Sequence, residues 1–192
     1  MNRISENGRT MIEVIGVLAI ITAVTIALTK MVNKMHDRFK ISQITQEITD
    51  LRKNVSNRYV ANGDYTGITD ADIISGKVAP SEMVDGNKLV HAYNGDVEII
   101  GDHDSYKITF SSLPHSACVE LALMNWNFNG STDLFEIKVN ETEFKWPLLA
   151  GTGPKLPVEI TDATTACSPP PPKDDSTPVR DLNDNEITWT FR

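Results

Sequence analysis

The longest apolar run in the chain, from Met11 to Thr29, reads MIEVIGVLAIITAVTIALT and contains one charged residue, Glu13. A helix of this length measures about 28 Å, close to the thickness of a bilayer's hydrocarbon core. The run is longer than the apolar core of a typical secretory signal, and no A-x-A-type cleavage site follows Leu28. It therefore predicts a membrane-spanning helix.

The apolar pattern continues past this run as a stripe on one helical face. Apolar residues recur at steps of three and four from Met31 to Tyr59, and charged residues occupy the other side. Neither Pro nor Gly interrupts residues 18–60, and Asn62-Gly63 supplies a stop signal. We expect one helix of about 51 residues, about 77 Å long, whose last third packs under a sheet.

The residues after 62 predict an α+β head built on an antiparallel β-sheet. Residues 63–88 form a linking stretch with one short helical turn, capped by Thr69 or Asp70. Strands are expected at Leu89–Tyr93, Val97–Ile100, Tyr106–Phe110, Leu134–Val139 and Ile187–Phe191, with a hairpin at Asn140–Lys145 and a short helix within Leu113–Trp126. We expect residues 148–192 to be loop-rich before the final strand. The segment SPPPPKDDSTP is either a stiff exposed loop or a ligand for a proline-binding partner.

Charge is distributed unevenly along the chain. Residues 1–61 carry nine Lys/Arg and five Asp/Glu, a net of +4, whereas residues 62–192 carry nine and 21, a net of −12. The acidic head argues against direct nucleic-acid binding, because phosphate contacts require Lys and Arg. Four basic residues follow the apolar run, and they are either solvated or meet anionic lipid or the acidic face of a neighbouring subunit: Lys30, Lys34, Arg38 and Lys40.

Glu13 needs an explanation, because a carboxylate at the centre of a membrane helix costs about 2.5–3.5 kcal/mol, and less near its end. The segment NG-RTMIEVIGVLAIITAVTIAL resembles the amino-terminal signature of type IV prepilins. The resemblance implies cleavage after Gly8 by a prepilin peptidase, N-methylation of Arg9, and a filament-assembly role for Glu13, the fifth residue of the mature chain. Arg9 departs from the apolar residue usual at this place. A plain signal peptide or single-pass anchor is the alternative, but it gives Glu13 no role.

The same resemblance implies an organisation and a location. Residues 1–8 are then a leader, 9–29 the transmembrane and assembly helix, 30–61 its amphipathic continuation, and 62–192 the globular pilin head. The subunit sits in the inner membrane with its head in the periplasm, contacts lipid and the pilus assembly platform, and then joins an extracellular homopolymer. The stretch SLPHSACVELALMNWNFNG resembles the heads of type IVb pilins.

The two cysteines, Cys118 and Cys167, suggest one disulfide, because their number is even and the head is expected to be exported. In the chain-entropy model, the loop that this disulfide closes corresponds to a stabilisation of about 4 kcal/mol. The alternative is a pair of unpaired buried thiols in a cytosolic protein. Their spacing does not fit a metal site.

The sequence holds no nucleophile elbow, phosphate loop, HExxH or dinucleotide fingerprint, so we expect neither an enzyme nor a cofactor. His103 lies between two aspartates in a predicted turn. Asp181–Glu186 partly imitates a calcium loop but lacks its sixth-position Gly and twelfth-position Glu, so we assign no metal site. Two other functions remain open: a pseudopilin of a type II secretion system, and a membrane-anchored periplasmic binding or enzymatic domain.

Overall fold

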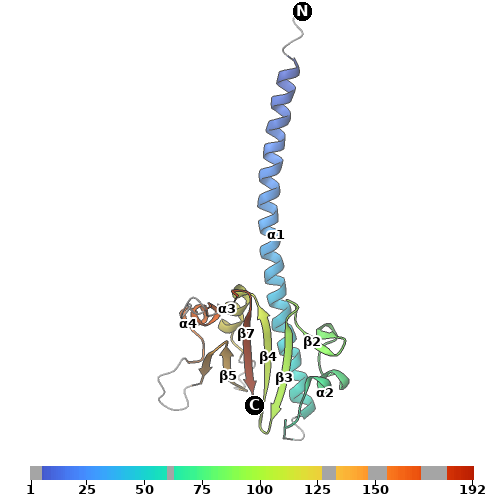
Figure 1. The fold of residues 1–192 in the computed structure, drawn as a ribbon, viewed down its shortest axis with the longest axis vertical. Coiled ribbons are helices and arrows are strands. Elements are labelled where there is room, and N and C mark those ends of the chain that lie inside the picture. Colours follow the sequence, from blue (N-terminus) through green and yellow to red (C-terminus); the bar gives the residue numbers. More distant parts are fainter. Residues whose placement is uncertain (1–5, 60–62, 127–132, 147–154, 170–180) are drawn as a thin grey trace, which may run out of the picture. The chain divides into compact units, whose positions relative to one another are not determined.

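The computed structural model describes residues 6–59, 63–126, 133–146, 155–169 and 181–192. The chain divides into two compact units, Met1–Phe39 and Lys40–Arg192. One helix, α1 (Glu6–Tyr59), contributes to both (Figure 1). The long helix predicted from the apolar pattern is therefore confirmed, and it ends within a few residues of the predicted stop.

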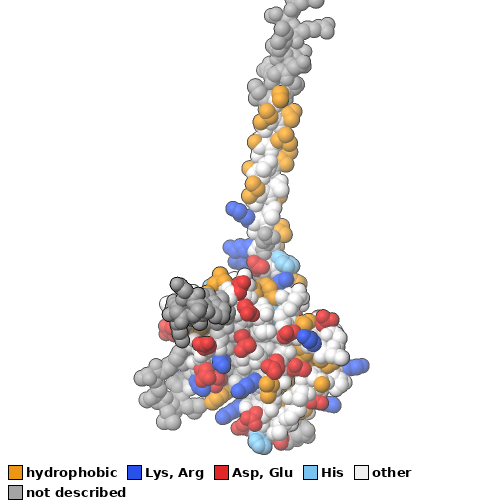
Figure 2. Space-filling model, in the orientation of Figure 1, with side chains coloured by type: hydrophobic (Ala, Val, Ile, Leu, Met, Phe, Trp, Pro, Cys, Tyr) orange, Lys and Arg blue, Asp and Glu red, His pale blue; other side chains and the backbone are white. Residues whose placement is uncertain are grey.

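The first unit is the amino-terminal part of α1, and its described side chains are exposed. Apolar side chains cover this part of the helix (Figure 2). Its threonine hydroxyls are satisfied within the helix: Thr22, Thr25 and Thr29 donate to the carbonyl oxygens four residues earlier, at 2.8–2.9 Å. Such internal bonds let a threonine sit in an apolar environment without an unsatisfied hydroxyl.

The second unit contains a seven-stranded antiparallel sheet in the order β1-β2-β3-β4-β7-β5-β6 (Figure 1). Its strands are β1 (Val84–Asp85), β2 (Lys88–Val90), β3 (Asp96–Asp102), β4 (Ser105–Leu113), β5 (Leu134–Val139), β6 (Thr142–Lys145) and β7 (Asn185–Phe191). All the strands predicted from the sequence are present. The two-residue strand β1 was not predicted. Tyr93 lies outside β2, because the chain turns at Asn94, whose φ is 62°.

Three short helices accompany the sheet, together with a 3₁₀ turn at Ser81–Met83. Helix α2 (Asp70–Ser75) has the predicted cap, since Thr69 and Asp72 form a capping box. Helix α3 (His115–Leu123) follows Pro114, which stands at the N-cap position.

The prediction that the chain after residue 148 is rich in loops is wrong for one segment. Residues Ile160–Cys167 form helix α4, although the segment contains three threonines and lacks a side-chain N-cap bond. Its Ala163, Ala166 and Cys167 are buried, so packing stabilises a helix that local propensity does not favour.

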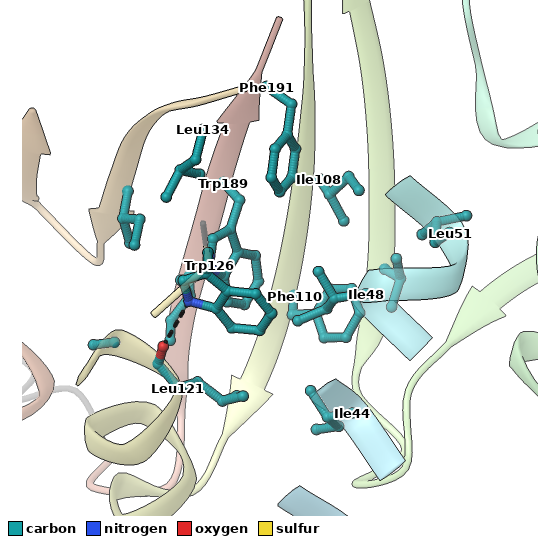
Figure 3. Packing of buried hydrophobic residues seen from close by; sticks show 14 of the residues in the cluster. Ile44, Ile48, Leu51, Ile108, Phe110, Leu121, Trp126, Leu134, Trp189 and Phe191 are labelled. Carbon is teal, nitrogen blue, oxygen red and sulfur yellow. Dashed lines mark hydrogen bonds between the residues drawn. The ribbon is translucent and has the colours of Figure 1, made fainter. Parts of the chain in front are cut away.

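The core lies between the sheet and the carboxy-terminal part of α1, from Lys40 onward. Figure 3 shows Ile44, Ile48 and Leu51 of α1 beside aromatic and aliphatic side chains of β4 and β7. The two indole rings, Trp126 and Trp189, meet edge to face at 5.3 Å. This burial explains the apolar stripe that the sequence shows on the second half of α1.

Strand β7 occupies a central position in the sheet. It pairs with β4 on one side and β5 on the other, and Trp189 lies opposite both Ile108 and Ile137. The alternating residues of ITWTF predicted a strand, but its position between β4 and β5 comes from long-range pairing.

Candidate functional site

The residues with expected roles in processing and assembly all lie on α1. Gly8 and Arg9 belong to the helix, but their side chains fall outside the described residues. Glu13 is exposed, and within the described residues no cation forms an ion pair with it. The described part of the chain has one helix whose length and composition suffice to cross a membrane, and it contains this segment. Among the described side chains, Glu13 is thus a carboxylate without a cationic partner on an apolar surface.

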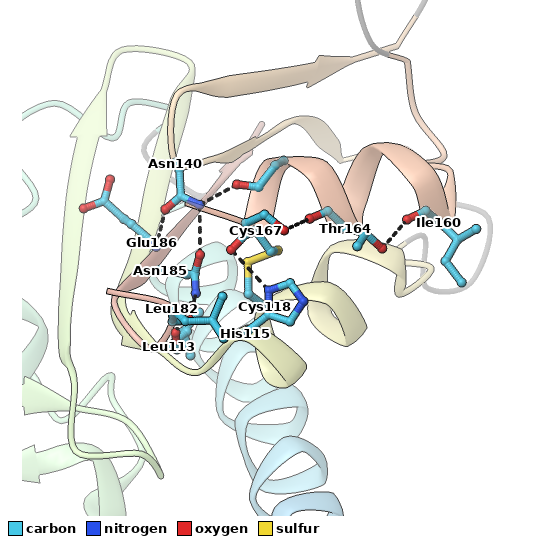
Figure 4. The surroundings of a disulfide bond; sticks show 12 residues. Leu113, His115, Cys118, Asn140, Ile160, Thr164, Cys167, Leu182, Asn185 and Glu186 are labelled. Carbon is cyan, nitrogen blue, oxygen red and sulfur yellow. Dashed lines mark hydrogen bonds between the residues drawn. A yellow bond between two sulfur atoms is a disulfide. The ribbon is translucent and has the colours of Figure 1, made fainter. Parts of the chain in front are cut away.

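Cys118 and Cys167, which are 49 residues apart in sequence, form a disulfide (Figure 4). It joins α3 to the end of α4, and both cysteines are fully buried. His115 donates from Nδ1 to the carbonyl oxygen of Cys167 at 3.2 Å, beside the bridge. The predicted disulfide is therefore confirmed, and it fixes the tail that follows β6 to the helix that follows β4.

An asparagine pair next to the disulfide links α4 to the sheet (Figure 4). Asn140, which has a φ of 53°, donates from Nδ2 to the carbonyl of Ala166 at 2.7 Å and to Oδ1 of Asn185 at 3.1 Å. Asn185 is fully buried and donates to the carbonyls of Leu113 and Leu182. This pair was not predicted from the sequence. Its only sequence signal was an asparagine at a hairpin turn, where positive φ is common.

Two buried titratable groups lie where α1 meets the sheet. The ring of His91 accepts at Nδ1 from the backbone N–H of Tyr93, and it donates from Nε2 to the carbonyl of Ser111 at 2.7 Å. It stacks on Phe110 with 5.1 Å between the rings. Burial lowers the pKa of His91, so the neutral ring is favoured.

Glu47 on α1 is the second buried group. Its carboxylate accepts from the side-chain amide of Gln43 at 3.0 Å and from the backbone N–H of Ala92 at 3.3 Å. Burial raises the pKa of Glu47 despite these two bonds. Glu47 therefore holds the turn after β2 against α1, and His91 ties the same turn to the end of β4.

Arg52 connects the same helix to the other side of the sheet. Its Nη2 donates to Oδ2 of Asp133 at 2.6 Å, and its guanidinium lies over the ring of Phe191 at 5.1 Å. The hydroxyl of Tyr106 donates to the backbone carbonyl of Arg52 at 3.3 Å. Burial raises the pKa of Tyr106, so it remains a neutral donor. These contacts fix the carboxy-terminal half of α1 within the head.

A cleft of about 320 Å³ opens at the β3 side of the sheet. Four carboxylate residues and one lysine line it, together with uncharged residues: Asp70, Asp96, Glu98, Glu186 and Lys88. Figure 2 shows acidic side chains spread over the visible face of the head. The charged side chains that line the cleft therefore carry a net negative charge.

Neither of the two acidic motifs seen in the sequence forms a cation cage. Asp181 accepts from the backbone N–H of Asn183 in a turn that leads into β7. His103 lies 3.7 Å from Asp64 and contacts Thr66, and its side chain is exposed. Across the described ranges, no group of three or more His, Cys, Asp or Glu is placed to hold a metal ion.

The chain was compared with known proteins. It is similar to the crystal structure of a type IV b pilin from Salmonella typhi, with 18% identity and a TM-score of 0.47, over 76% of this chain and 97% of that one. It is also similar to TcpA, a type IV pilin from the Vibrio cholerae El Tor biotype, with 11% identity and a TM-score of 0.47, over 80% and 99% of the two chains. No curated protein matches the chain. The family model described as PilS N terminal matches residues 38–190, so the chain belongs to that family and is a type IV pilin.

Proposed function

We propose that this pilin is a structural subunit of a type IV pilus of the IVb kind, cleaved between Gly8 and Arg9 and polymerised through its amino-terminal helix. The observation that carries the proposal is Glu13, an exposed carboxylate in an apolar helix segment that pairs with no cation among the described side chains. A prepilin peptidase would remove residues 1–8 and methylate the new amino group of Arg9. Glu13 then becomes the fifth residue of the mature chain.

Glu13 would act by pairing with the amino terminus of a neighbouring subunit. The amino group of its own chain lies about 6 Å away along the helix axis, four residues at about 1.5 Å each. A neighbour shifted by that distance brings its amino group level with the carboxylate. An opposite charge stabilises a carboxylate strongly in an apolar environment when the two groups are in good hydrogen-bonding geometry, and only weakly when they are misaligned. The pair would therefore set the axial register between subunits.

Before assembly, residues 9–29 would anchor the subunit in the inner membrane, with the head in the periplasm. The apolar side chains of α1 that are exposed in the single chain would face lipid in this state. The assembly platform would then transfer them to a bundle of like helices in the extracellular fibre. Because lipid and helix bundle are both apolar, the transfer costs little for these side chains, and the Glu13 pair supplies specificity.

The decisive test is Glu13→Val in cells that assemble the fibre, with Ile15→Val as the matched control on the same segment. Glu13→Val removes the charge, so we expect normal membrane levels and normal processing but a steep loss of surface fibres. The control should assemble normally. Normal fibres from Glu13→Val would overturn the registering role. Membrane levels are measured in the same cells, because loss of the subunit would show instability instead of failed assembly.

Processing has a separate test. The intact mass of the membrane protein should correspond to a chain that begins at methylated Arg9. Gly8→Asp should block cleavage, because it places a charged side chain where the peptidase needs a small residue, and the mass should then retain residues 1–8. A mature protein that begins at any other residue would contradict the assignment.

A further inference from the structure

The segment that follows the membrane-length run contains a four-residue repeat. A basic residue precedes a large apolar one three times, as Lys30-Met31, Lys34-Met35 and Arg38-Phe39. All six side chains are exposed, with Met31, Met35 and Phe39 between 61% and 67%. Few soluble helices leave three large apolar side chains in a row uncovered without a partner.

The repeat produces two parallel stripes on α1. Each residue advances about 100° around the helix, so a step of four drifts by only about 40°. Lys30, Lys34 and Arg38 therefore form one stripe, and the apolar residues form a second stripe about 100° further around the helix. We call the two together the basic–apolar face.

Among the ion pairs of the described residues, none involves the basic side chains of this face, Lys30, Lys34 and Arg38. Lys40, the next basic residue, differs because its Nζ lies 4.9 Å above the ring of Tyr93 in the head. The repeat therefore ends where α1 begins to pack in the head.

The basic residues also oppose the membrane orientation proposed above. Four Lys/Arg lie within fifteen residues after the apolar run, and two, Arg3 and Arg9, lie before it. The positive-inside rule would leave the more basic flank in the cytoplasm, yet this flank leads to the exported head. A positive cluster that works against export needs another role.

Anionic lipid explains only part of this face. Phe39 lies ten residues beyond Thr29, about 15 Å past the end of the apolar run. Lipid head groups extend only about 6–7 Å beyond the hydrocarbon core, so lipid would leave the last repeat uncovered. A protein partner that offers both carboxylates and apolar contact fits the whole length.

The acidic head of a second copy has these properties. Strand β3 directs Asp96, Glu98, Ile100 and Asp102 outward, and Ile100 is 51% exposed. Outward positions on a strand repeat at about 6.8 Å, close to the 6 Å spacing of the helical repeat. The head carries an excess of 12 negative charges, so heads packed together in a fibre would repel each other without nearby cations.

We propose that the basic–apolar face of one subunit docks against the outward face of β3 in a second copy of this chain. The inference rests on the proposed function, because it places the contact between subunits of the pilus. Lys34 and Arg38 meet the carboxylates of Asp96 and Glu98, and the apolar stripe covers Ile100. The contact neutralises the acidic heads as they come together.

Charge reversal in the full-length chain tests the contact. Lys34→Glu and Glu98→Lys should each reduce surface fibres by about tenfold at unchanged membrane levels, because each places like charges opposite one another. The double variant should restore fibres, since every copy then presents the inverted pair. Lys53→Glu and Glu141→Lys are matched controls that reverse the charge of exposed side chains outside the proposed contact, on α1 and at the β5–β6 turn. Both variants should assemble normally.

A photo-crosslinking residue at position 35, which leaves Lys34 and Arg38 in place, supplies a readout that does not depend on fibres. It should capture a second copy through a peptide that contains residues 96–102. Normal fibres from Lys34→Glu, failure of the double variant, or crosslinks to lipid alone would each overturn the docking. If the chain that carries the photo-crosslinking residue forms this crosslink, and the wild-type chain forms no fibres, the proposed function is refuted and the docking is supported.

Discussion

The side-chain amide of Asn140 donates to the side-chain oxygen of Asn185 across 3.1 Å, and this bond joins the β5–β6 hairpin to the first residue of β7. The same Asn140 amide also bonds to Ala166 at the end of α4. One polar pair therefore holds together the hairpin, the central strand and the helix that carries Cys167.

Replacing Asn185 with alanine should destabilise the head by about 1–3 kcal/mol, because the carbonyls of Leu113 and Leu182 lose their buried donor. Chemical denaturation of the full-length protein in detergent measures the change. Asn183→Ala, two residues earlier and exposed, is the control and should be near neutral. Equal effects of the two variants would show that the buried bonds contribute little.

The disulfide should contribute about 2–5 kcal/mol to the stability of the head, because it restricts the unfolded chain across a long loop. Cys118→Ser combined with Cys167→Ser should lower the unfolding midpoint and reduce fibre yield. Reducing agent should have the same effect on wild type and none on the double variant. Unchanged stability on reduction would contradict this account.

Stability should fall in mild acid because of His91. Its pKa is lowered in the folded state from 6.5, so the unfolded chain takes up the proton first as the pH falls. Stability from this group is complete above pH 6.5 and is lost as the pH falls toward the folded-state pKa. His91→Gln should flatten the stability profile below pH 6.5. A slope equal to that of wild type would assign the acid sensitivity to other groups.

Ionisation of Glu47 should change stability with pH in the opposite direction to that of His91. Its pKa is raised in the folded state from 4.5, so the charged form costs stability as the pH rises through the folded-state pKa. Glu47→Gln should therefore unfold at a higher temperature than wild type at pH 7, and the difference should vanish below pH 4.5. Equal unfolding temperatures of Glu47→Gln and wild type at pH 7 would contradict this account.

The sequence was most informative where a periodic pattern of apolar residues coincides with burial of those residues in the core. The stripe containing Ile44, Ile48 and Leu51 is buried as its helical spacing predicted. The alternating residues of β3 and β7 likewise predicted strands. The disulfide followed from two cysteines in a head that was expected to be exported, because no other pairing within the chain was available.

Features that depend on distant partners were missed. Helix α4 is held by buried Ala163 and Ala166 and by the disulfide, whereas its threonines favour other conformations. His91 resembles an ordinary strand residue in the sequence, and its burial depends on Ser111 and on Gly95, where an added Cβ would collide with both His91 and the Ser111 carbonyl. Local patterns carry no information about which carbonyl a side chain will meet.

The central position of β7 also sets the order in which the head is built. Strands β4 and β5 are joined in the sheet only through β7, which follows every other strand of that sheet in the sequence. In a polypeptide that is made from its amino terminus, the edges of β4 and β5 that face β7 stay unpaired until residues 185–191 are present. The sheet can therefore be completed only after residues 185–191 have been made. A prematurely terminated subunit would carry a sound α1 but lack the strand that completes the sheet, and quality-control proteases could remove it before assembly.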